Sequence, residues 1–295
     1  MNEARILGAA AAEILYKPDM DNHLLDQGGQ APKGIVDPLG AAQRIRLGTY
    51  RPSAPLQDFV DYYWVVEWDR RGQAPAVQRV LPYPNAHLVF EHDRTAIHGV
   101  VRGAFERKVE GQGKVFGVRF KPGGLRPFFG LRQSLSSIAD RTMAADGVLR
   151  RPAADAEREI LGAGSDTAMV ALAEAMLLPI VPAPDPNVAF VQRAVAAAAT
   201  EHGPISVAAL CATVVIDERS LQRLFSNYVG VSPKWVIQRF GLQEAVWHLG
   251  RCDEAALAAL AARLGFFDQA HFTRQFGALV GQTPLAYWRS QHRSV

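Results

Sequence analysis

Apolar and polar positions follow two different spacings along this chain, and the change falls near its middle. Between about residues 47 and 122, short apolar runs rich in aromatic and β-branched residues alternate with turn-forming Gly, Pro, Asn and Asp. This spacing predicts several short strands, as in a small β-barrel or sandwich. The predicted strands are 59–68, 78–81, 87–91, 95–102 and 114–120.

After Gly123-Gly124 the spacing becomes helical, and it predicts helices over 128–138 and 153–178. Residues 181–187 contain three prolines in seven positions and predict a stiff linker between a domain at 46–180 and one at 188–295. Residues 1–45 show little periodicity, and 19–40 are rich in Gly, Pro, Asp and Asn, which predicts a partly flexible N-terminal arm.

The helical half contains a duplication, because the stretch 217–233 recurs at 268–284. A repeat at a fixed offset indicates two copies of one supersecondary unit. The matching pairs are Asp217 with Asp268, Arg223 with Arg274, Phe225 with Phe276, Val229 with Val280, Gly230 with Gly281 and Pro233 with Pro284.

Each copy predicts an amphipathic helix with an aspartate as N-cap, preceded by a short alanine-rich helix at 207–213 or 257–263. Two helices joined by a tight turn form a helix-turn-helix. Arginine and glutamine suit the outer face of such a unit, because they pair with guanine and adenine edges in the major groove. The alternative is an ordinary solvated helix. The outward positions are Arg219, Ser220, Gln222 and Arg223 in the first copy, and Gln269, Ala270, Thr273 and Arg274 in the second.

Residues 187–290 resemble the DNA-binding domain of the AraC family of transcriptional regulators. The second copy carries the motif of that family at Ala261, Gly265-Phe266, Asp268, Phe272, Arg274, Phe276, Gly281 and Thr283-Pro284. The resemblance implies two helix-turn-helix units joined by a linker helix over about 234–249, in which Arg239, Ala245 and Leu249 occupy family positions. It also implies a promoter site on double-stranded DNA, contact with RNA polymerase, and a homodimer.

Two residues depart from the family pattern. Val215 stands where the first unit usually has glycine in its turn, and since a β-branched residue resists positive φ, we expect that turn to be reshaped. Cys211 replaces a usual alanine, which we interpret as a harmless small buried substitution.

The N-terminal half resembles the sensor domains of a subset of AraC-type regulators. The shared pieces are Tyr50-Arg51-Pro52, Pro55-Leu56 with Val60 and Tyr63-Trp64, Leu81-Pro82 with Leu88-Val89-Phe90, and the segment from Gly117 to Gly124. The resemblance implies a cupin-like domain that binds an effector or mediates dimerisation. Tyr62, Trp64 and Tyr83, together with Trp68, are candidates for lining an apolar ligand pocket, and the alternative is plain core.

Composition and charge narrow the function further. Of the 295 residues 48% are hydrophobic, and no apolar run approaches the ~20 residues needed to cross a bilayer, so we expect a cytoplasmic protein without membrane contact. Residues 1–186 hold 22 basic and 22 acidic side chains, whereas 187–295 hold 10 and 7, so the +3 excess lies in the helical half. A basic bias there fits phosphate contact.

The residues give no support for catalysis. Both cysteines, Cys211 and Cys252, lie in the helical half, which excludes the cysteine chemistry of alkyl-transfer DNA-repair proteins that share a similar DNA-binding domain. We interpret His87, His92 and His98 as solvent-facing or structural histidines, since they lack the spacing of a metal site. We therefore expect no cofactor, no metal and no enzyme activity.

The sequence predicts an α+β protein of two domains that binds promoter DNA specifically and regulates transcription, controlled by a small-molecule effector in the N-terminal domain. The alternatives are a cupin-type metal enzyme and an architectural DNA-binding protein, each carrying an AraC-like domain. The predicted DNA-contacting residues are Arg219, Ser220, Gln222, Arg223, Gln269, Ala270, His271, Thr273 and Arg274.

Overall fold

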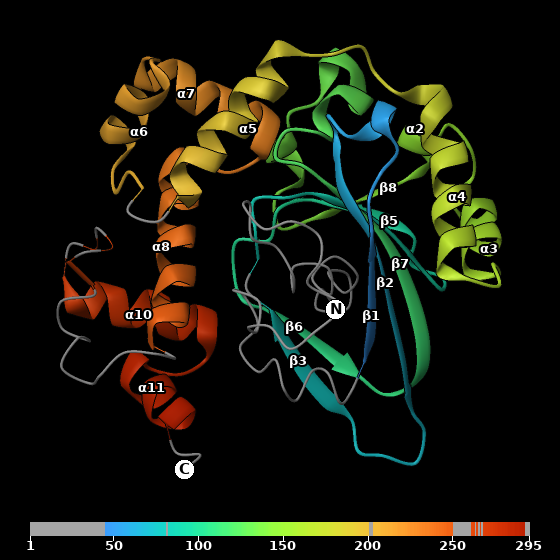
Figure 1. The fold of residues 1–295 in the computed structure, drawn as a ribbon, viewed down its shortest axis with the longest axis horizontal. Helices are drawn as coiled ribbons and strands as arrows, with labels where there is room; N and C mark the ends of the chain where they lie inside the picture. The colour runs from blue at the N-terminus through green and yellow to red at the C-terminus, as the bar shows by residue number, and fades with distance from the viewer. Residues whose placement is uncertain are drawn as a thin grey trace.

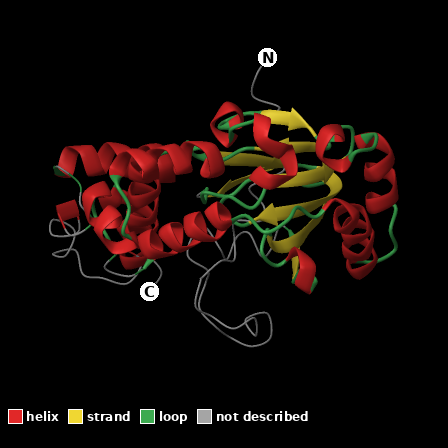
Figure 2. Ribbon diagram, turned by 90° about the horizontal axis from the view of Figure 1, so that it is seen from above, coloured by secondary structure: helices red, strands yellow, loops and turns green. Residues whose placement is uncertain are grey.

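The structure, a computed structural model, describes residues 45–80, 82–200, 203–249, 261–262, 264, 266 and 268–292. A sheet with helices packed on it forms the N-terminal part, and a group of helices lies beside it at the C-terminal end (Figures 1 and 2). The predicted N-terminal arm and most of the predicted helix 257–263 lie outside the described residues. Among the helices described, none combines the length and the apolar character that a membrane span requires.

The N-terminal part is built on a six-stranded antiparallel sheet in the order β1-β2-β7-β4-β5-β8, with β3 and β6 forming a separate two-stranded ribbon. In the described strands this order ends at β1 and β8, which do not pair with each other. The β-rich domain that we predicted as a small barrel or sandwich is therefore present, and its closure into a barrel is not shown. The strands are β1 (Arg46–Tyr50), β2 (Val60–Arg70), β3 (Ala76–Val80), β4 (His87–Glu91), β5 (Ala96–His98), β6 (Phe105–Val109), β7 (Gly111–Phe120) and β8 (Thr142–Ala144).

The predicted strands are found, with one marked difference in length. The range 87–91 coincides with β4, whereas the range 95–102 is strand only over β5. The strand stops at Gly99, whose N–H donates to the Arg141 carbonyl at 3.1 Å. A Cβ at Gly99 would lie 2.0 Å from the Ile138 carbonyl oxygen, so only glycine allows the two segments to cross this closely.

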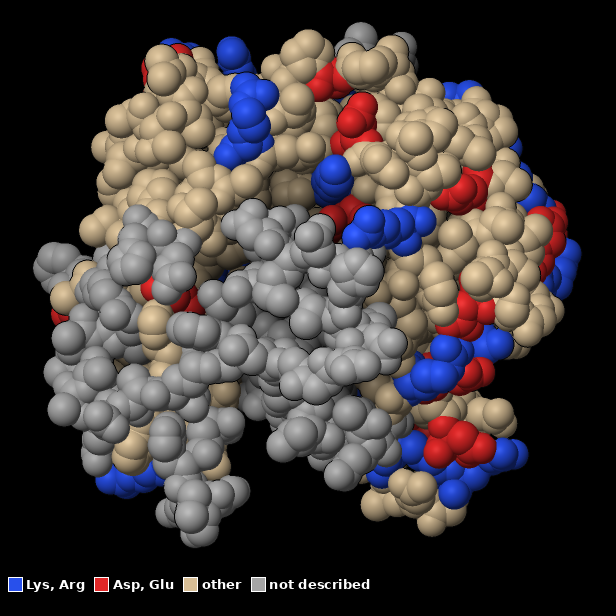
Figure 3. All heavy atoms as spheres, viewed as in Figure 1, with Lys and Arg blue, Asp and Glu red and all other residues tan. Residues whose placement is uncertain are grey.

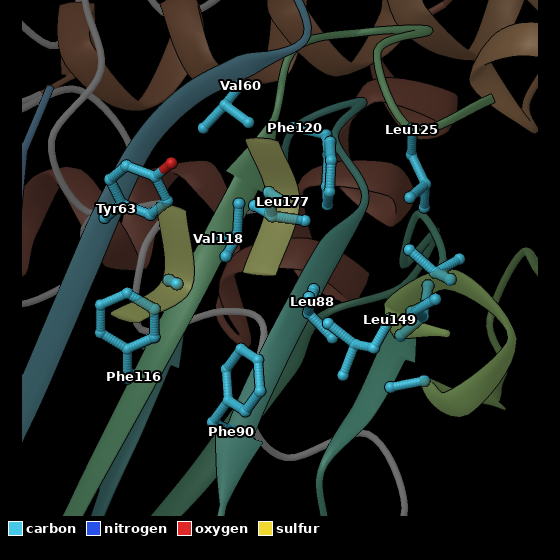
Figure 4. Close-up of a cluster of buried hydrophobic side chains, with 14 of the residues drawn as sticks. Val60, Tyr63, Leu88, Phe90, Phe116, Val118, Phe120, Leu125, Leu149 and Leu177 are labelled. Carbon is cyan, nitrogen blue, oxygen red and sulfur yellow. The ribbon is translucent and has the colours of Figure 1, made fainter. Parts of the chain in front are cut away.

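One face of the sheet forms the larger hydrophobic core (Figure 4). Alternate residues of the central strands, such as Leu88, Phe116 and Val118, are fully buried there. Burial of such a side chain stabilises the fold by about 1.5–3 kcal/mol. Three helices cover this face, namely α2 (Asp146–Leu149), α3 (Ala153–Leu161) and α4 (Asp166–Leu177).

Two predicted helices of this part are divided. The range 153–178 is split into α3 and α4 by Gly162 and Gly164, and Ser165 caps α4 by accepting from the Ala168 N–H at 3.2 Å. The range 128–138 is not α-helical: it forms the 3₁₀ segments η4 (Arg126–Arg132) and η5 (Leu135–Ile138). Gly130, at φ 66°, breaks the first, and this backbone conformation is incompatible with a continuous right-handed helix.

The C-terminal part is helical and contains two separate hydrophobic cores. The first includes buried residues of α5, α6, α7, η7 and the start of α8, and the second those of the end of α8, α10 and α11. The elements are α5 (Pro186–Ala199), α6 (Val207–Val214), α7 (Glu218–Leu224), the π-helical turn η7 (Phe225–Val229), α8 (Pro233–Leu249), α10 (Gln269–Val280) and α11 (Pro284–His292). The predicted linker helix 234–249 is therefore present as α8.

Candidate nucleic-acid interface

The first copy of the repeat begins with α7, and the preceding helix α6 is joined to it by a three-residue turn. Both helices begin with a side-chain cap. Ser206 accepts from the Ala209 N–H at 3.1 Å, and Asp217 accepts from the Ser220 N–H at 2.9 Å. The hydrogen bond from the Ser220 backbone lowers the pKa of the Asp217 carboxyl, so this cap is charged at neutral pH. These caps fix where each helix starts, and the sequence predicted the one at Asp217.

The turn between α6 and α7 keeps the left-handed conformation although it contains no glycine. Val215 ends α6 with φ 56° and ψ 65°, and the Ile216 N–H donates to the Cys211 carbonyl at 3.2 Å. Our expectation that valine would reshape the turn is therefore wrong. The conformation costs an L-residue about 1–2 kcal/mol, and Val215, at 87% exposed, recovers little of that by packing.

The outward face of α7 carries the residues that the sequence placed there. Arg219, Gln222 and Arg223 are exposed and Ser220 is half-buried. The Gln222 amide donates to the Glu218 carboxylate at 2.8 Å, so it would exchange this bond for a base edge when it reads DNA. The opposite side is fully buried at Leu221 and Phe225, as the apolar stripe predicts.

The second copy presents the same arrangement on α10. Asp268 caps the helix by accepting from the His271 N–H at 2.6 Å. Phe272 and Phe276 lie in the second core at 1% and 0% exposure. The outward positions divide into exposed residues, which are Gln269, Ala270 and Arg274, and half-buried ones, which are His271 and Thr273.

His271 also serves the packing of this unit. Its ring lies edge-to-face on Phe266 at 5.8 Å between ring centroids, and Phe266 in turn packs on Phe272 at 5.1 Å. The imidazole is therefore held in place by the core, and its backbone N–H is used by the Asp268 cap. Among the predicted DNA-contacting residues, His271 therefore has a structural role in the packing and capping of α10.

Sequence reasoning missed a contact between the first recognition helix and the N-terminal part. The π-helical turn η7 continues α7 and packs on η5, where the Ser134 hydroxyl donates to the Ser226 carbonyl at 2.8 Å. Arg126 of η4 lies over the Tyr228 ring at 5.8 Å, and the Tyr228 hydroxyl donates to Asp185 at 2.6 Å. π-Helical turns are frequent at functional sites, and this one places the end of α7 against the sheet domain.

The three aromatic ligand candidates lie near one row of residues that crosses the sheet. The register pairs Tyr62 with Arg119, Arg119 with His87, and His87 with His98, so these side chains share one face. Trp64 lies on the same face two residues further along β2, and its indole occupies the space beside Gly117, where a Cβ would come within 2.0 Å. Tyr83 lies outside the strands and contacts this row at Arg119, whose guanidinium lies 5.0 Å from the centre of the tyrosine ring.

Arg119 is the charged centre of this row, and the sequence did not single it out. It is 1% exposed, its Nε lies 3.2 Å from an Asp61 carboxylate oxygen, and its other nitrogens donate to the Asn85 side-chain oxygen at 2.9 Å and the Tyr62 hydroxyl at 3.1 Å. Burial raises the pKa of Asp61, and the positive charge of Arg119 opposes that rise. A buried arginine of this kind requires such partners, since an unpaired buried charge is very costly.

The neighbouring histidines are buried and uncharged at neutral pH. Burial lowers the pKa of His98 to about 4, and burial together with the charge of Arg119 lowers the pKa of His87 well below its ordinary value. The Nε1 of Trp64 and the Nδ1 of His98 are buried without a protein hydrogen-bond partner among the described residues. These histidines are therefore structural parts of the sheet face that carries Trp64 and Arg119, which lies opposite the larger core and is called the inner face from here on. His92 is the exposed one of the three.

His92 belongs to the one group with metal-ligand spacing that the described residues contain, together with Asp93 and Glu157. The two oxygens of Glu157 already accept from the Asp93 N–H at 2.9 Å and the Thr95 hydroxyl at 2.7 Å, and His92 contacts Asp93 at 2.8 Å. These bonds hold the β4–β5 turn, where Asp93 has φ 59°. The hydrogen bonds of this turn account for the close approach of His92, Asp93 and Glu157.

Charge on the visible face of the molecule agrees with the balance in the sequence. Basic and acidic side chains lie next to each other over the N-terminal part, on the right of Figure 3. Several of them form ion pairs, such as Arg46 with Asp166 at 2.7 Å. The face shown in Figure 3 has basic and acidic side chains mixed, and such a mixture gives no extended basic field for DNA.

Two family models match separate regions of the chain. Residues 210–290 match the family described as "Helix-turn-helix domain", and residues 48–144 match the family described as "Domain of unknown function (DUF6597)". No curated protein matches the sequence significantly.

Among solved structures, the chain is similar to ToxT from Vibrio cholerae O395, with 9% identity and a TM-score of 0.32 over 86% of this chain and 100% of that one. A structure of wild-type ToxT from Vibrio cholerae strain SCE256 with bound unsaturated fatty acid matches at 11% identity and a TM-score of 0.32, over 83% and 91% of the two chains. At these TM-scores the likeness supports no argument about this chain.

Proposed function

We propose that this chain, whose C-terminal region is an AraC-type helix-turn-helix domain, is a sequence-specific DNA-binding regulator of transcription. The observation that carries the proposal is the equivalence of α7 and α10. Each helix has an aspartate cap, a buried apolar side and an exposed arginine at the same distance from the cap, Arg223 in one and Arg274 in the other. Two such helices would act as two recognition helices on one DNA duplex.

Each helix would read a separate segment of the major groove. Gln269, Thr273 and Arg274 would contact one segment, and Arg219, Gln222 and Arg223 would contact another about one helical turn away. Ser220, Ala270 and His271 lie beside these residues and would touch the DNA backbone or a thymine methyl group. Loss of a bidentate base contact would cost about 1–3 kcal/mol and relax specificity at one position.

The N-terminal part would act as the sensor and dimerisation domain, in keeping with its resemblance to the sensor domains of AraC-type regulators. The prolines of 181–187 would divide the two domains. This division is supported by the large N-terminal core, which reaches Val181, and by α5, which packs in the first helical core. The ligand would bind on the inner face of the sheet, near Tyr62, Trp64 and Tyr83. Its binding would shift the equilibrium between arrangements of the two DNA-reading units, which is how differential affinity produces regulation. Contact with RNA polymerase belongs to the same proposal.

Selection of binding sites from a random DNA library with the full-length protein tests this function. We expect enrichment of a split motif whose two blocks are about one helical turn apart. Affinity should fall with salt, since each phosphate contact contributes close to one unit to the slope of log K against log salt. Absence of any enriched motif at low and moderate salt would overturn sequence-specific regulation.

A further inference from the structure

Helix α8 contributes buried residues to both cores of the C-terminal part, and it also contacts the N-terminal part. One of these contacts is made by Phe240, which also packs against the first core. We propose that these contacts form a clamp that couples the buried Arg119 row of the sheet to the relative position of the two DNA-reading units. The clamp consists of Arg239, Phe240 and Gln243 on α8, held by Arg102, Tyr83 and Pro82 of the N-terminal part. This inference rests on the proposed function and specifies how it is controlled.

The polar residues of the clamp are buried and reach main-chain carbonyls of the N-terminal part. Arg239, at 4% exposure, donates to the Arg102 carbonyl at 2.5 Å, and its guanidinium lies 4.6 Å from the centre of the Trp235 ring. Gln243, also at 4% exposure, directs its amide to the Pro82 carbonyl at 3.5 Å. A buried polar side chain without its partner is costly, so these bonds favour one docked position of the helix.

An aromatic contact links the clamp to the inner face of the sheet. The rings of Tyr83 and Phe240 meet edge-to-face, with their centroids 5.8 Å apart and their planes at 66°. The guanidinium of Arg119 lies over the same Tyr83 ring at 5.0 Å. Tyr83, at 6% exposure, is therefore the side chain through which a rearrangement around Arg119 reaches α8.

The two ends of α8 belong to the two DNA-reading units. Val236 and Ile237 lie in the first core, whereas Leu242 and Leu249 lie in the second. The first unit is also docked on the N-terminal part through η5 and η7, where a Cβ on Gly230 would come within 2.8 Å of the Leu135 carbonyl oxygen. With one unit docked, the position of α8 determines where the second unit stands (Figure 1).

The clamped arrangement is the one suited to DNA binding. Arg219, Gln222 and Arg223 on α7 are exposed while the clamp is closed, and so are Gln269 and Arg274 on α10. The N-terminal part therefore covers neither reading face. A fixed relation between two recognition helices raises the affinity for a two-block site, because the ordering cost is met before binding. Release of the clamp should weaken two-block binding and leave single-block binding unchanged.

The test compares the affinity of the full-length protein for the selected two-block DNA with that for the same DNA with one block scrambled. The variants are Phe240→Leu, Tyr83→Leu and the double variant, since leucine keeps apolar bulk and removes the ring. Phe190→Leu is the matched control, because Phe190 is a half-buried phenylalanine packed against the first core, on α5 rather than α8. Thermal unfolding of each variant confirms that it folds.

We expect each single clamp variant to lower two-block affinity by about two- to tenfold, with one-block affinity unchanged. This factor corresponds to the interaction energy of an edge-to-face aromatic pair. The double variant should be no weaker than the single variants, since both remove one contact. Phe190→Leu should leave the ratio of the two affinities as in the wild type. An unchanged ratio in the single variants, a gain in two-block affinity, or effects that multiply in the double variant would each overturn the clamp.

A further variant tests the link between Arg119 and the clamp without creating a cavity in the core. Tyr62→Phe removes only the hydroxyl that accepts from Arg119 at 3.1 Å. We expect a loss of at least twofold in two-block affinity and none in one-block affinity, and an unchanged ratio would overturn the coupling to the Arg119 row. Failure of the proposed function is a distinct result, because the wild-type protein would then bind two-block and fully scrambled DNA equally.

Discussion

The hydroxyl of Ser134 donates a hydrogen bond of 2.8 Å to the main-chain carbonyl of Ser226, 92 residues further along the chain. Ser134 is the N-cap of η5 in the N-terminal part, and Ser226 lies in the π-helical turn that ends the first recognition helix. The bond therefore ties the end of α7, which we propose to read DNA, to the sheet domain.

We predict that Ser134→Ala loosens this docking. Loss of the hydrogen bond should cost about 1 kcal/mol, and the backbone amides at the end of the recognition helix should exchange faster with solvent. Hydrogen exchange of the full chain measures this effect. Ser137→Ala is the control, since the Ser137 hydroxyl donates to the Ser134 carbonyl within the N-terminal part. Equal exchange of η7 in both variants would contradict the assignment.

Replacement of Val215 by glycine should stabilise the first helix-turn-helix unit. Val215 holds a left-handed conformation at φ 56° while 87% exposed, so the substitution removes steric strain and little packing. The strain of about 1–2 kcal/mol is partly offset by the larger conformational entropy of glycine in the unfolded chain, which leaves a gain of about 1 kcal/mol. Urea unfolding measures the change. Val215→Ala keeps a Cβ and should gain much less, and an equal gain from alanine would show that the backbone conformation is not the cause.

Stability should fall when the pH drops from about 6.5 towards 4. The folded-state pKa of His98 is about 4 and its ordinary value 6.5, so between these values the unfolded chain binds a proton that the folded chain does not. Stability is therefore full above pH 6.5 and is lost as the pH falls, by up to about 3 kcal/mol for this group. His87 shifts in the same direction.

The substitution His98→Gln isolates this effect, because glutamine stays neutral throughout. The difference in unfolding free energy between wild type and variant should change across this pH window and stay constant above pH 7. A difference that is the same at pH 4.5 and pH 7.5 would contradict the buried neutral histidine.

The sequence predicted those features that depend on neighbouring residues. The caps Asp217 and Asp268 and the stripe around Phe225 and Phe276 each lie within a few turns of one helix, so the spacing alone determines them. The strands β2, β4 and β7 were found for the same reason, since their apolar and aromatic runs are continuous.

The features that sequence reasoning missed depend on distant segments. β6 carries mixed charges and is a strand because it pairs with β3. Arg119 stands between the buried Val118 and Phe120, and nothing in that local pattern shows that Asp61, Asn85 and Tyr62 come together around it. The turn at Val215 was mispredicted because the helix contacts on either side outweigh the local preference of valine.

The same library selection with Arg274→Ala and Arg223→Ala tests the central claim that two equivalent helices read two blocks of DNA. Arg289→Ala is the control, because Arg289 is an exposed arginine on α11 and its loss removes the same single positive charge. We predict that Arg274→Ala loses specificity in one block only, that Arg223→Ala loses it in the other, and that Arg289→Ala keeps both. A uniform loss of affinity with an unchanged motif in both variants would contradict base reading by these arginines and assign them to the phosphates.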